Sequence, residues 1–182
     1  MTDRADPDVV PDTKDWTWWV LGRPCPDCGY DAGAVRPGDV AAHLRRDADD
    51  WTTRLAAATA RTRPAPGVWS VLEYGCHVRD VHRIFAGRVR SMLEEDEPRF
   101  PNWDQDQTAL DEHYGAQEPA SVAEDLRQAA AVVADLYDTV PADGWSRRGL
   151  RSNGSEFTIA SLSTYHLHDI AHHAWDVTGP TT

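Results

Sequence analysis

Apolar residues recur at alternating steps of three and four in four separate stretches of this 182-residue chain. In the first stretch the apolar positions are Ala41, Leu44, Ala48, Trp51, Leu55 and Ala58, and similar series run through residues 74–92, 122–140 and 158–177. This spacing places the apolar side chains on one face of an α-helix. Because no stretch alternates in the way that strands do, the sequence predicts an all-α four-helix bundle.

Two of the predicted helices begin at a recognisable capping motif. Ser70 with Glu73, and Ser121 with Glu124, have the form of a capping box. In this motif each of the two side chains binds a free backbone N–H at the start of the helix. We therefore expect the second helix to begin just after Ser70 and the third just after Ser121.

Residues 1–34 differ in composition from the rest of the chain. They contain an acidic leader punctuated by prolines and a tight Cys-Pro-Asp-Cys-Gly loop, and the helical period begins only after them. Prolines and acidic residues at this density do not favour a packed helix. We therefore expect an irregular N-terminal extension over residues 1–34, followed by the bundle over residues 35–182.

The charge balance excludes several classes of protein. Eighteen lysine and arginine residues face thirty aspartate and glutamate residues, a net charge of −12, which argues against nucleic acid or an anionic membrane surface as the partner. Lys14, the only lysine, lies in the leader, so a Schiff-base enzyme is not expected. No apolar run is long enough for a membrane span or a secretory signal. The sequence predicts a cytoplasmic protein that binds a small molecule and could pair as a homodimer.

Histidine is the residue type whose placement points to chemistry. His168 and His172 lie four apart in the last helix, so both rings leave the same face about 6 Å apart, a spacing that offers two nitrogens to one metal ion. His166 and His173 are seven apart, roughly 10 Å along the helix axis and too far for one ordinary metal site. His77 lies on the apolar stripe of the second helix, where a metal ion, a tyrosine or a carboxylate would satisfy a buried imidazole.

Imidazoles from His77, His168 and His172 would leave an open position on a divalent ion, as in catalytic sites. Asp169 or Asp176 would then accept the second N–H of a ligating ring and fix its orientation, and we assign this supporting role in catalysis to Asp169. The alternative is that these histidines are ordinary core residues. His82, at the edge of the same stripe, is either a surface residue or a substitute ligand.

The loop Cys25-Pro-Asp-Cys28-Gly29 has the form of one half of a zinc ribbon. Cys76 is the only other cysteine, which is too few for a site with four cysteines. Three interpretations remain. The pair forms a local disulfide or a redox-active dithiol, it binds a structural zinc ion completed by His43 or a carboxylate, or it is a tight turn with free thiols. A reducing cytoplasm slightly favours the free thiols.

Two polar groups outside the helices could contact a bound molecule. Asp104 and Asp106 lie on the long connection after the second helix, which would have to fold back along that helix to reach its histidine. Arg147 and Arg148, with Arg151, form the one local basic cluster and could hold an anionic group. In each case the alternative is a packed or solvated surface loop.

Two segments carry a resemblance to a known family. They are Pro66-Gly-Val-Trp-Ser-Val-Leu-Glu-Tyr-Gly-Cys-His-Val-Arg-Asp80 and His168-Asp-Ile-Ala-His-His-Ala-Trp-Asp176. Over residues 35–178 the sequence resembles the DinB-like metalloprotein superfamily, which includes mycothiol-dependent maleylpyruvate isomerases and related thiol S-transferases. The resemblance implies a divalent metal ion, often zinc or nickel, held by histidines that correspond to His77, His168 and His172. In the thiol-transferring members the metal binds the cofactor sulfur as a thiolate.

We therefore expect a divalent-metal-dependent enzyme that transfers or activates a low-molecular-weight thiol such as mycothiol, because a divalent ion lowers the pKa of a thiol. A metal-dependent hydrolase is the related alternative, since the open position could hold hydroxide. Two alternatives are not enzymes: a metal- or ligand-binding bundle, and a protein–protein adaptor that uses the cysteine loop. Imidazole ligands suit zinc, nickel, copper and iron alike, so the natural metal stays open.

Overall fold

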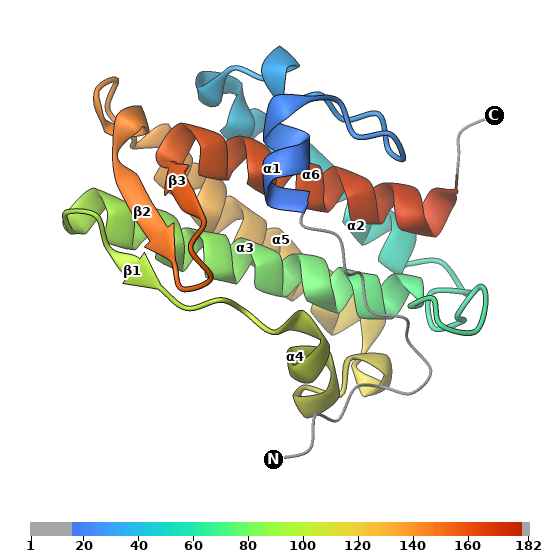
Figure 1. The fold of residues 1–182 in the computed structure, drawn as a ribbon. Coiled ribbons are helices and arrows are strands. Elements are labelled where there is room, and N and C mark those ends of the chain that lie inside the picture. Colours follow the sequence, from blue (N-terminus) through green and yellow to red (C-terminus); the bar gives the residue numbers. More distant parts are fainter. Residues whose placement is uncertain (1–15, 180–182) are drawn as a thin grey trace.

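Four long helices form the body of the protein. The computed structural model describes residues 16–179, and the acidic leader over residues 1–15 lies outside them. The long helices are α2 (Val40–Leu55), α3 (Val71–Glu94), α5 (Pro119–Asp138) and α6 (Ile159–Thr178). They correspond to the four periodic stretches, so the prediction of a four-helix bundle is confirmed (Figure 1). No helix within residues 16–179 is long and apolar enough to cross a bilayer.

The helices do not pack in the order of the chain. α5 packs against both α2 and α3, and α6 also contacts both of them. By contrast, α2 and α3 make few contacts with each other, and α5 and α6 make almost none. Around the bundle the order is therefore α2, α5, α3, α6, with α2 diagonal to α3 and α5 diagonal to α6. This arrangement places α3, which carries His77, beside the histidine-rich α6 (Figure 1).

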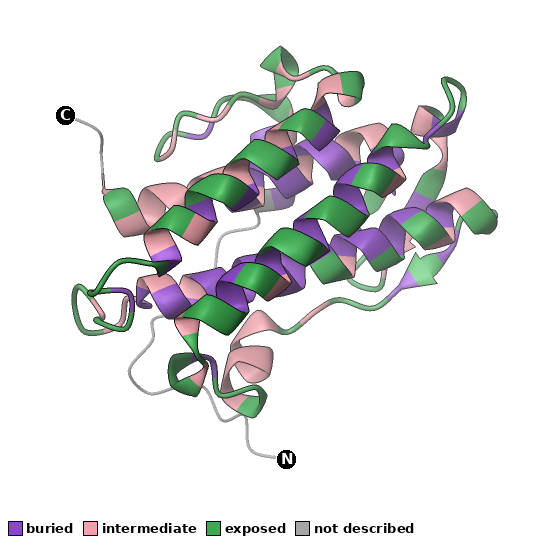
Figure 2. Cartoon of the chain, turned by 180° about the vertical axis from the view of Figure 1, so that it is seen from behind, coloured by how far each residue is buried: buried purple, intermediate pink, exposed green. Residues whose placement is uncertain are grey.

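The core consists of the apolar stripes that the spacing predicted. Trp51 of α2, Phe85 of α3, Leu126 of α5 and Leu162 of α6 are all at most 2 % exposed. Figure 2 shows buried residues on the inner faces of the helices and exposed residues on their outer faces. Burying one such side chain contributes about 1.5–3 kcal/mol, so the stripes supply much of the stability of the bundle.

Of the two helix starts predicted from capping boxes, one is confirmed and the other is wrong. The capping box at α3 is confirmed, since Ser70 Oγ accepts from the N–H of Glu73 at 3.3 Å and Glu73 Oε2 accepts from the N–H of Ser70 at 2.8 Å. The box predicted at Ser121 is wrong, because α5 already begins at Pro119. Proline at the first helical position has no N–H to satisfy, and its fixed φ favours the helix, so Pro119 itself is a signal for this start.

A small three-stranded sheet lies at one end of the bundle, although the sequence indicated no strand. β1 (Arg99–Phe100) pairs in parallel with β2 (Arg148–Arg151), and β2 pairs in antiparallel with β3 (Glu156–Thr158). These strands are too short to produce a visible alternation. At Gly149 an added Cβ would lie 2.7 Å from the Phe100 ring, so this close approach requires glycine.

Candidate metal centres

Two groups of metal-ligating side chains lie on neighbouring faces of α6. The His–Asp group consists of His77, Asp169 and His173, and the Cys–His group consists of Cys25, Cys28, His168 and His172. Within each group, one potential ligand atom from every member lies within 4.8 Å of the others. Histidine nitrogen, cysteine sulfur and carboxylate oxygen are the protein ligands of divalent transition metals. Both groups are therefore candidate metal centres.

Helix α6 supplies a pair of residues four apart to each group. Asp169 and His173 belong to the His–Asp group, and His168 and His172 belong to the Cys–His group. Successive residues of an α-helix project about 100° apart, so these two pairs have the same spacing and point in different directions. One pair meets α3, and the other meets the N-terminal cysteine loop.

The three histidines proposed as ligands from the sequence are divided between these groups. His77 lies with Asp169 and His173, whereas His168 and His172 lie with the two cysteines. Sequence spacing could not separate the two pairs, because both are four apart. His173 was considered only in a pair seven residues apart, and Asp169 was considered only as a supporting residue. The pair 169/173 was the signal that sequence reasoning missed.

The His–Asp group converges on one carboxylate oxygen. Asp169 Oδ1 lies 3.4 Å from His77 Nε2 and 3.5 Å from His173 Nε2. The His77 side chain is fully buried. Neither of its ring nitrogens, nor Asp169 Oδ1, has a hydrogen-bond partner of acceptable geometry within residues 16–179. Buried polar atoms are rarely left in this state, and a cation between the three side chains would satisfy His77 Nε2 and Asp169 Oδ1.

The protonation states of this group suit metal binding. Burial lowers the pKa of His77, because it penalises the charged imidazolium, although the nearby Asp169 opposes this shift. Burial acts to raise the pKa of Asp169, but the adjacent His77 and His173 outweigh it and hold that pKa well below its usual range. At neutral pH the group therefore offers neutral His77 and an ionised Asp169, the forms in which these residues bind metal ions.

The long connection between α3 and α5 folds back and covers His77. Trp103, on this connection, stacks on the His77 ring with 5.2 Å between ring centroids and 6° between planes. The indole N–H of Trp103 donates to Thr108 Oγ1 at 2.7 Å, within the short helix α4 (Gln105–Asp111). The stacking shields one face of the imidazole from water, so the connection forms part of the environment of the candidate metal centre.

Other aromatic side chains also pack against the His–Asp group. Trp69 lies 5.7 Å from His77 between ring centroids, and Tyr74 lies 5.1 Å from His173. Trp69 also contacts the buried Tyr114, at 6.2 Å. Such packing holds the two imidazoles in place and lowers the local dielectric, which strengthens any electrostatic interaction there.

Asp176 contacts one member of each group. Its Oδ2 accepts a hydrogen bond from His173 Nδ1 at 2.8 Å, and its Oδ1 lies 3.8 Å from His172 Nε2. A hydrogen bond at one ring nitrogen of a histidine selects the tautomer whose other nitrogen is the ligand. The sequence suggested that Asp169 or Asp176 would accept the second N–H of a ligating histidine. In the structure Asp176 has this position beside His173, while Asp169 lies among the potential ligand atoms themselves.

The remaining residues proposed for ligand contacts take part in local structure. Asp104 accepts a hydrogen bond at 2.9 Å from a backbone N–H of α4, and Asp106 lies in the first turn of that helix. Arg147 donates to backbone carbonyls at the C-terminal end of α3, and Arg148 pairs with two glutamates. That end of α3 is roughly 25 Å along the helix from His77. None of the four belongs to either candidate metal centre.

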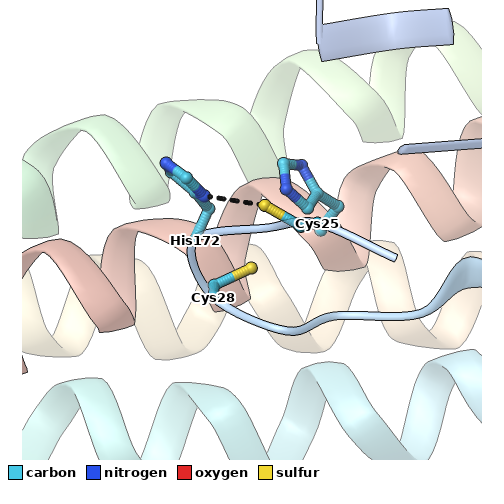
Figure 3. Close-up of side chains that lie close together, drawn as sticks. Cys25, Cys28 and His172 are labelled. Atoms are coloured by element: carbon cyan, nitrogen blue, oxygen red, sulfur yellow. Dashed lines mark hydrogen bonds between the residues drawn. The ribbon is translucent and has the colours of Figure 1, made fainter. Parts of the chain in front are cut away.

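The Cys–His group joins the N-terminal loop to α6. Cys25 Sγ lies 3.6 Å from His172 Nδ1, and the Cys28 thiol lies nearby on the same loop (Figure 3). Both cysteines are free thiols. Burial raises the pKa of Cys28 to about 11, so without a cation this thiol is protonated at neutral pH. His43, considered as a zinc ligand, instead contacts Arg46 on α2.

His82 and His166 form a third histidine cluster that belongs to neither group. His82 Nδ1 lies 3.0 Å from His166 Nε2, and both side chains are fully buried between α3 and α6. Of the two alternatives for His82, the surface residue is therefore wrong, because the buried face of α3 is wider than the spacing suggested. Burial lowers the pKa of His82 to about 3.

Comparisons with known proteins agree with this architecture. The family model of the DinB superfamily matches residues 42–177. The solved structure of YfiT from Bacillus subtilis, described as a probable metal-dependent hydrolase with an unusual four-helix bundle topology, is similar with a TM-score of 0.62 and 17 % sequence identity. The match covers 94 % of this chain and 90 % of YfiT. No curated protein sequence matches. The family match spans most of the bundle, and the chain belongs to the DinB superfamily.

Proposed function

We propose that this protein is a divalent-metal-dependent enzyme whose ion is held by His77, Asp169 and His173. One observation carries the proposal: ligand atoms from α3 and α6 converge within 4.8 Å of one another, and those of His77 and Asp169 lack hydrogen-bond partners of acceptable geometry within residues 16–179. Two imidazoles and one carboxylate fit zinc, nickel or iron and leave coordination positions open. An open position is what distinguishes a catalytic site from a structural one.

When bound, a divalent ion would lower the pKa of a thiol or a water molecule toward neutrality and so supply a nucleophile. The residues of this chain would position and protect that chemistry. Asp176 would hold His173 in the required tautomer through its 2.8 Å hydrogen bond. Trp103 and Trp69 would keep bulk water away from His77. The single carboxylate of Asp169 leaves one positive charge of the ion uncompensated, which favours an anionic thiolate or hydroxide.

We further propose that the activated molecule is a low-molecular-weight thiol, of which mycothiol is an example. Support comes from the resemblance of the segments at residues 66–80 and 168–176 to a superfamily that includes thiol-transferring members. Hydrolysis is the second candidate function. It is supported by the likeness of the fold to that of YfiT, which is described as a probable metal-dependent hydrolase.

The test compares metal content and cobalt spectra of the purified wild type, His77→Ala and His43→Ala. We expect His77→Ala to lose the ion of the His–Asp group, because it removes the only ligand from α3. His43→Ala serves as the matched control, since His43 lies on α2 in neither group. Added thiol should change the cobalt spectrum of wild type but not that of His77→Ala, and this difference isolates the His–Asp group.

Two results would contradict parts of this proposal. If wild type and His77→Ala bind equal amounts of metal under all loading conditions, the His–Asp group is not a metal centre. If the His–Asp group binds cobalt but added thiol leaves its spectrum unchanged, thiol activation is ruled out. Hydrolysis then becomes the leading function, to be assayed with activated esters and amides.

A further inference from the structure

The Cys–His group has no part in the function proposed above. Its members come from two places that are far apart in the chain: Cys25 and His172 are 147 residues apart. Two cysteines in a C-x₂-C loop and two histidines four apart on a helix are the donor set of Cys₂His₂ structural zinc sites. One interpretation of the sequence is a zinc ion at the cysteine loop completed by His43 or a carboxylate, whereas in the structure His168 and His172 lie beside the loop.

The cysteine loop has a closed backbone conformation that turns both thiols to one side. The N–H of Gly29 donates to the carbonyl of Cys25 at 3.0 Å, and the N–H of Cys25 donates to the carbonyl of Tyr30 at 2.8 Å. Gly29 adopts a φ of +74°, where residues with a side chain are strained. Figure 3 shows the Cys25 and Cys28 thiols on this loop and His172 reaching toward Cys25 from the adjacent helix.

The loop is attached to α6 by contacts that need no metal ion. The Tyr30 hydroxyl donates to the carbonyl of Thr164 at 2.9 Å, and the Tyr30 ring lies 5.7 Å from the His168 ring between centroids. Cys25 is only 2 % exposed. Because these contacts already hold the loop against the helix, the four ligand atoms are brought together before any ion binds.

The distance between Cys25 and His172 matches that of two ligands in a tetrahedral zinc site. Zinc binds sulfur at about 2.3 Å and imidazole nitrogen at about 2.0–2.1 Å, so a sulfur and a nitrogen on one tetrahedral ion lie about 3.6 Å apart. Cys25 Sγ and His172 Nδ1 are 3.6 Å apart. All four ligand atoms lie within 4.8 Å of one another, so small rotations of the other side chains complete the tetrahedron.

We propose that Cys25, Cys28, His168 and His172 form a structural zinc site that fastens the N-terminal loop to α6. On binding Zn²⁺ the two thiols release their protons to solvent, and the resulting thiolates cancel the charge of the ion. A neutral centre of this kind is suited to a largely buried position. Four protein ligands fill the tetrahedral coordination, so the site has no position for a substrate. It is independent of the proposed function of the His–Asp group.

The experiment measures zinc per chain and the cobalt spectrum of the full-length protein and its variants. We expect wild type to retain zinc against a weak chelator, and its cobalt form to show the intense thiolate-to-cobalt charge-transfer band of a tetrahedral site. The double variant Cys25→Ser/Cys28→Ser should lose both the zinc and the band. The matched control is Cys76→Ser, because Cys76 is buried on α3 outside both groups and should leave both readouts unchanged.

His77→Ala separates this proposal from the proposed function. That variant should keep the tightly bound zinc and the charge-transfer band, even though it loses the ion of the His–Asp group. Fastening the loop closes a segment of more than a hundred residues, so the double cysteine variant should also melt roughly 5–10 °C lower than wild type. His172→Ala should weaken the band. A metal site formed by the two cysteines without His172 would keep the band unchanged in this variant.

Alkylation of wild type keeps the proposal testable even if the cysteine variants do not fold. Cys28 is half-exposed, so zinc should protect it from an alkylating reagent and a strong chelator should remove the protection. Equal alkylation of Cys28 with and without zinc would overturn the proposal. A mass of the native protein that is lower by two hydrogen atoms because Cys25 and Cys28 form a disulfide would also overturn it. A charge-transfer band that survives in Cys25→Ser/Cys28→Ser would do the same.

Discussion

The two groups on α6 use the same local geometry but face different surroundings. In each, two residues four apart project from one face of the helix. The His–Asp group faces α3, which adds a single buried imidazole, and the Cys–His group faces a loop that adds two thiols. Helical spacing therefore presents a pair of potential ligands, while the element opposite determines whether one imidazole or two thiols join them.

The group with more potential ligands also has more groups that can carry a negative charge. The His–Asp group has one carboxylate, so a divalent ion there would keep a net positive charge that can attract an anionic nucleophile. The Cys–His group has two thiols, whose thiolates would neutralise the ion. Excess charge is useful in a catalytic site and costly in a buried structural one. This difference supports the proposed catalytic role of the His–Asp group and the proposed structural role of the Cys–His group.

Substituting the adjacent residues His172 and His173 tests most directly whether the two groups have separate roles. We expect His173→Ala to lower activity about a thousandfold, because loss of an ion that contributes several kcal/mol to transition-state stabilisation has an effect of this size. The same variant should keep the thiolate-to-cobalt band of the Cys–His group. His172→Ala should have the reverse pattern, with the band weakened and activity largely retained. Similar losses of activity in both variants would show that the two groups act as one site.

Asp176 tests how far the groups are independent, since it contacts both. Asp176→Asn removes the charged acceptor from His173 Nδ1, to which it is bonded at 2.8 Å, but leaves every ligand in place. We expect metal affinity at the His–Asp group to fall about 10–100-fold, the range found when the hydrogen-bond partner of a ligating histidine is removed. The 3.8 Å contact with His172 is longer, so zinc retention at the Cys–His group should change less. Competition with a chromogenic chelator measures both.

The His82–His166 pair shows how buried histidines between the same two helices behave outside the two candidate metal centres. The folded protein keeps His82 neutral down to about pH 3, because burial lowers its pKa from 6.5 to about 3. Below pH 6.5 the unfolded chain binds a proton at this residue that the folded chain does not. Its share of the free energy of unfolding is therefore constant above pH 6.5 and falls by about 1.4 kcal/mol per pH unit below it.

His82→Phe should reduce the slope of the free energy of unfolding against pH below pH 6.5, because about one proton fewer is taken up on unfolding. Denaturant titrations between about pH 7 and about pH 4, with chelator present throughout, would measure this slope without a contribution from metal release. His43→Phe is the matched control, because it makes the same substitution at a histidine outside the buried core. An unchanged slope in His82→Phe would mean that His82 is protonated within the folded protein.

Much of the fold was predictable because it depends on local patterns. The apolar period located α2, α3, α5 and α6, and the capping box located the start of α3. The prediction for α5 was wrong where two local signals competed, since Pro119 begins that helix two residues before Ser121. The small sheet could not be predicted, because each strand is only two to four residues long and β1 pairs with residues of β2 that lie about fifty positions away in sequence.

The sequence by itself determined the helices, the ligand types and the spacing of four between histidines. Only the tertiary structure decided which pair faces which partner. A shift of one residue along α6 turns a pair by about 100°, and the spacing contains no information about that direction. The direction is set by the packing of α3 beside α6 and by the Tyr30–Thr164 contact, which seats the cysteine loop on the helix. Long-range packing therefore separated one histidine-rich helix into two candidate metal centres.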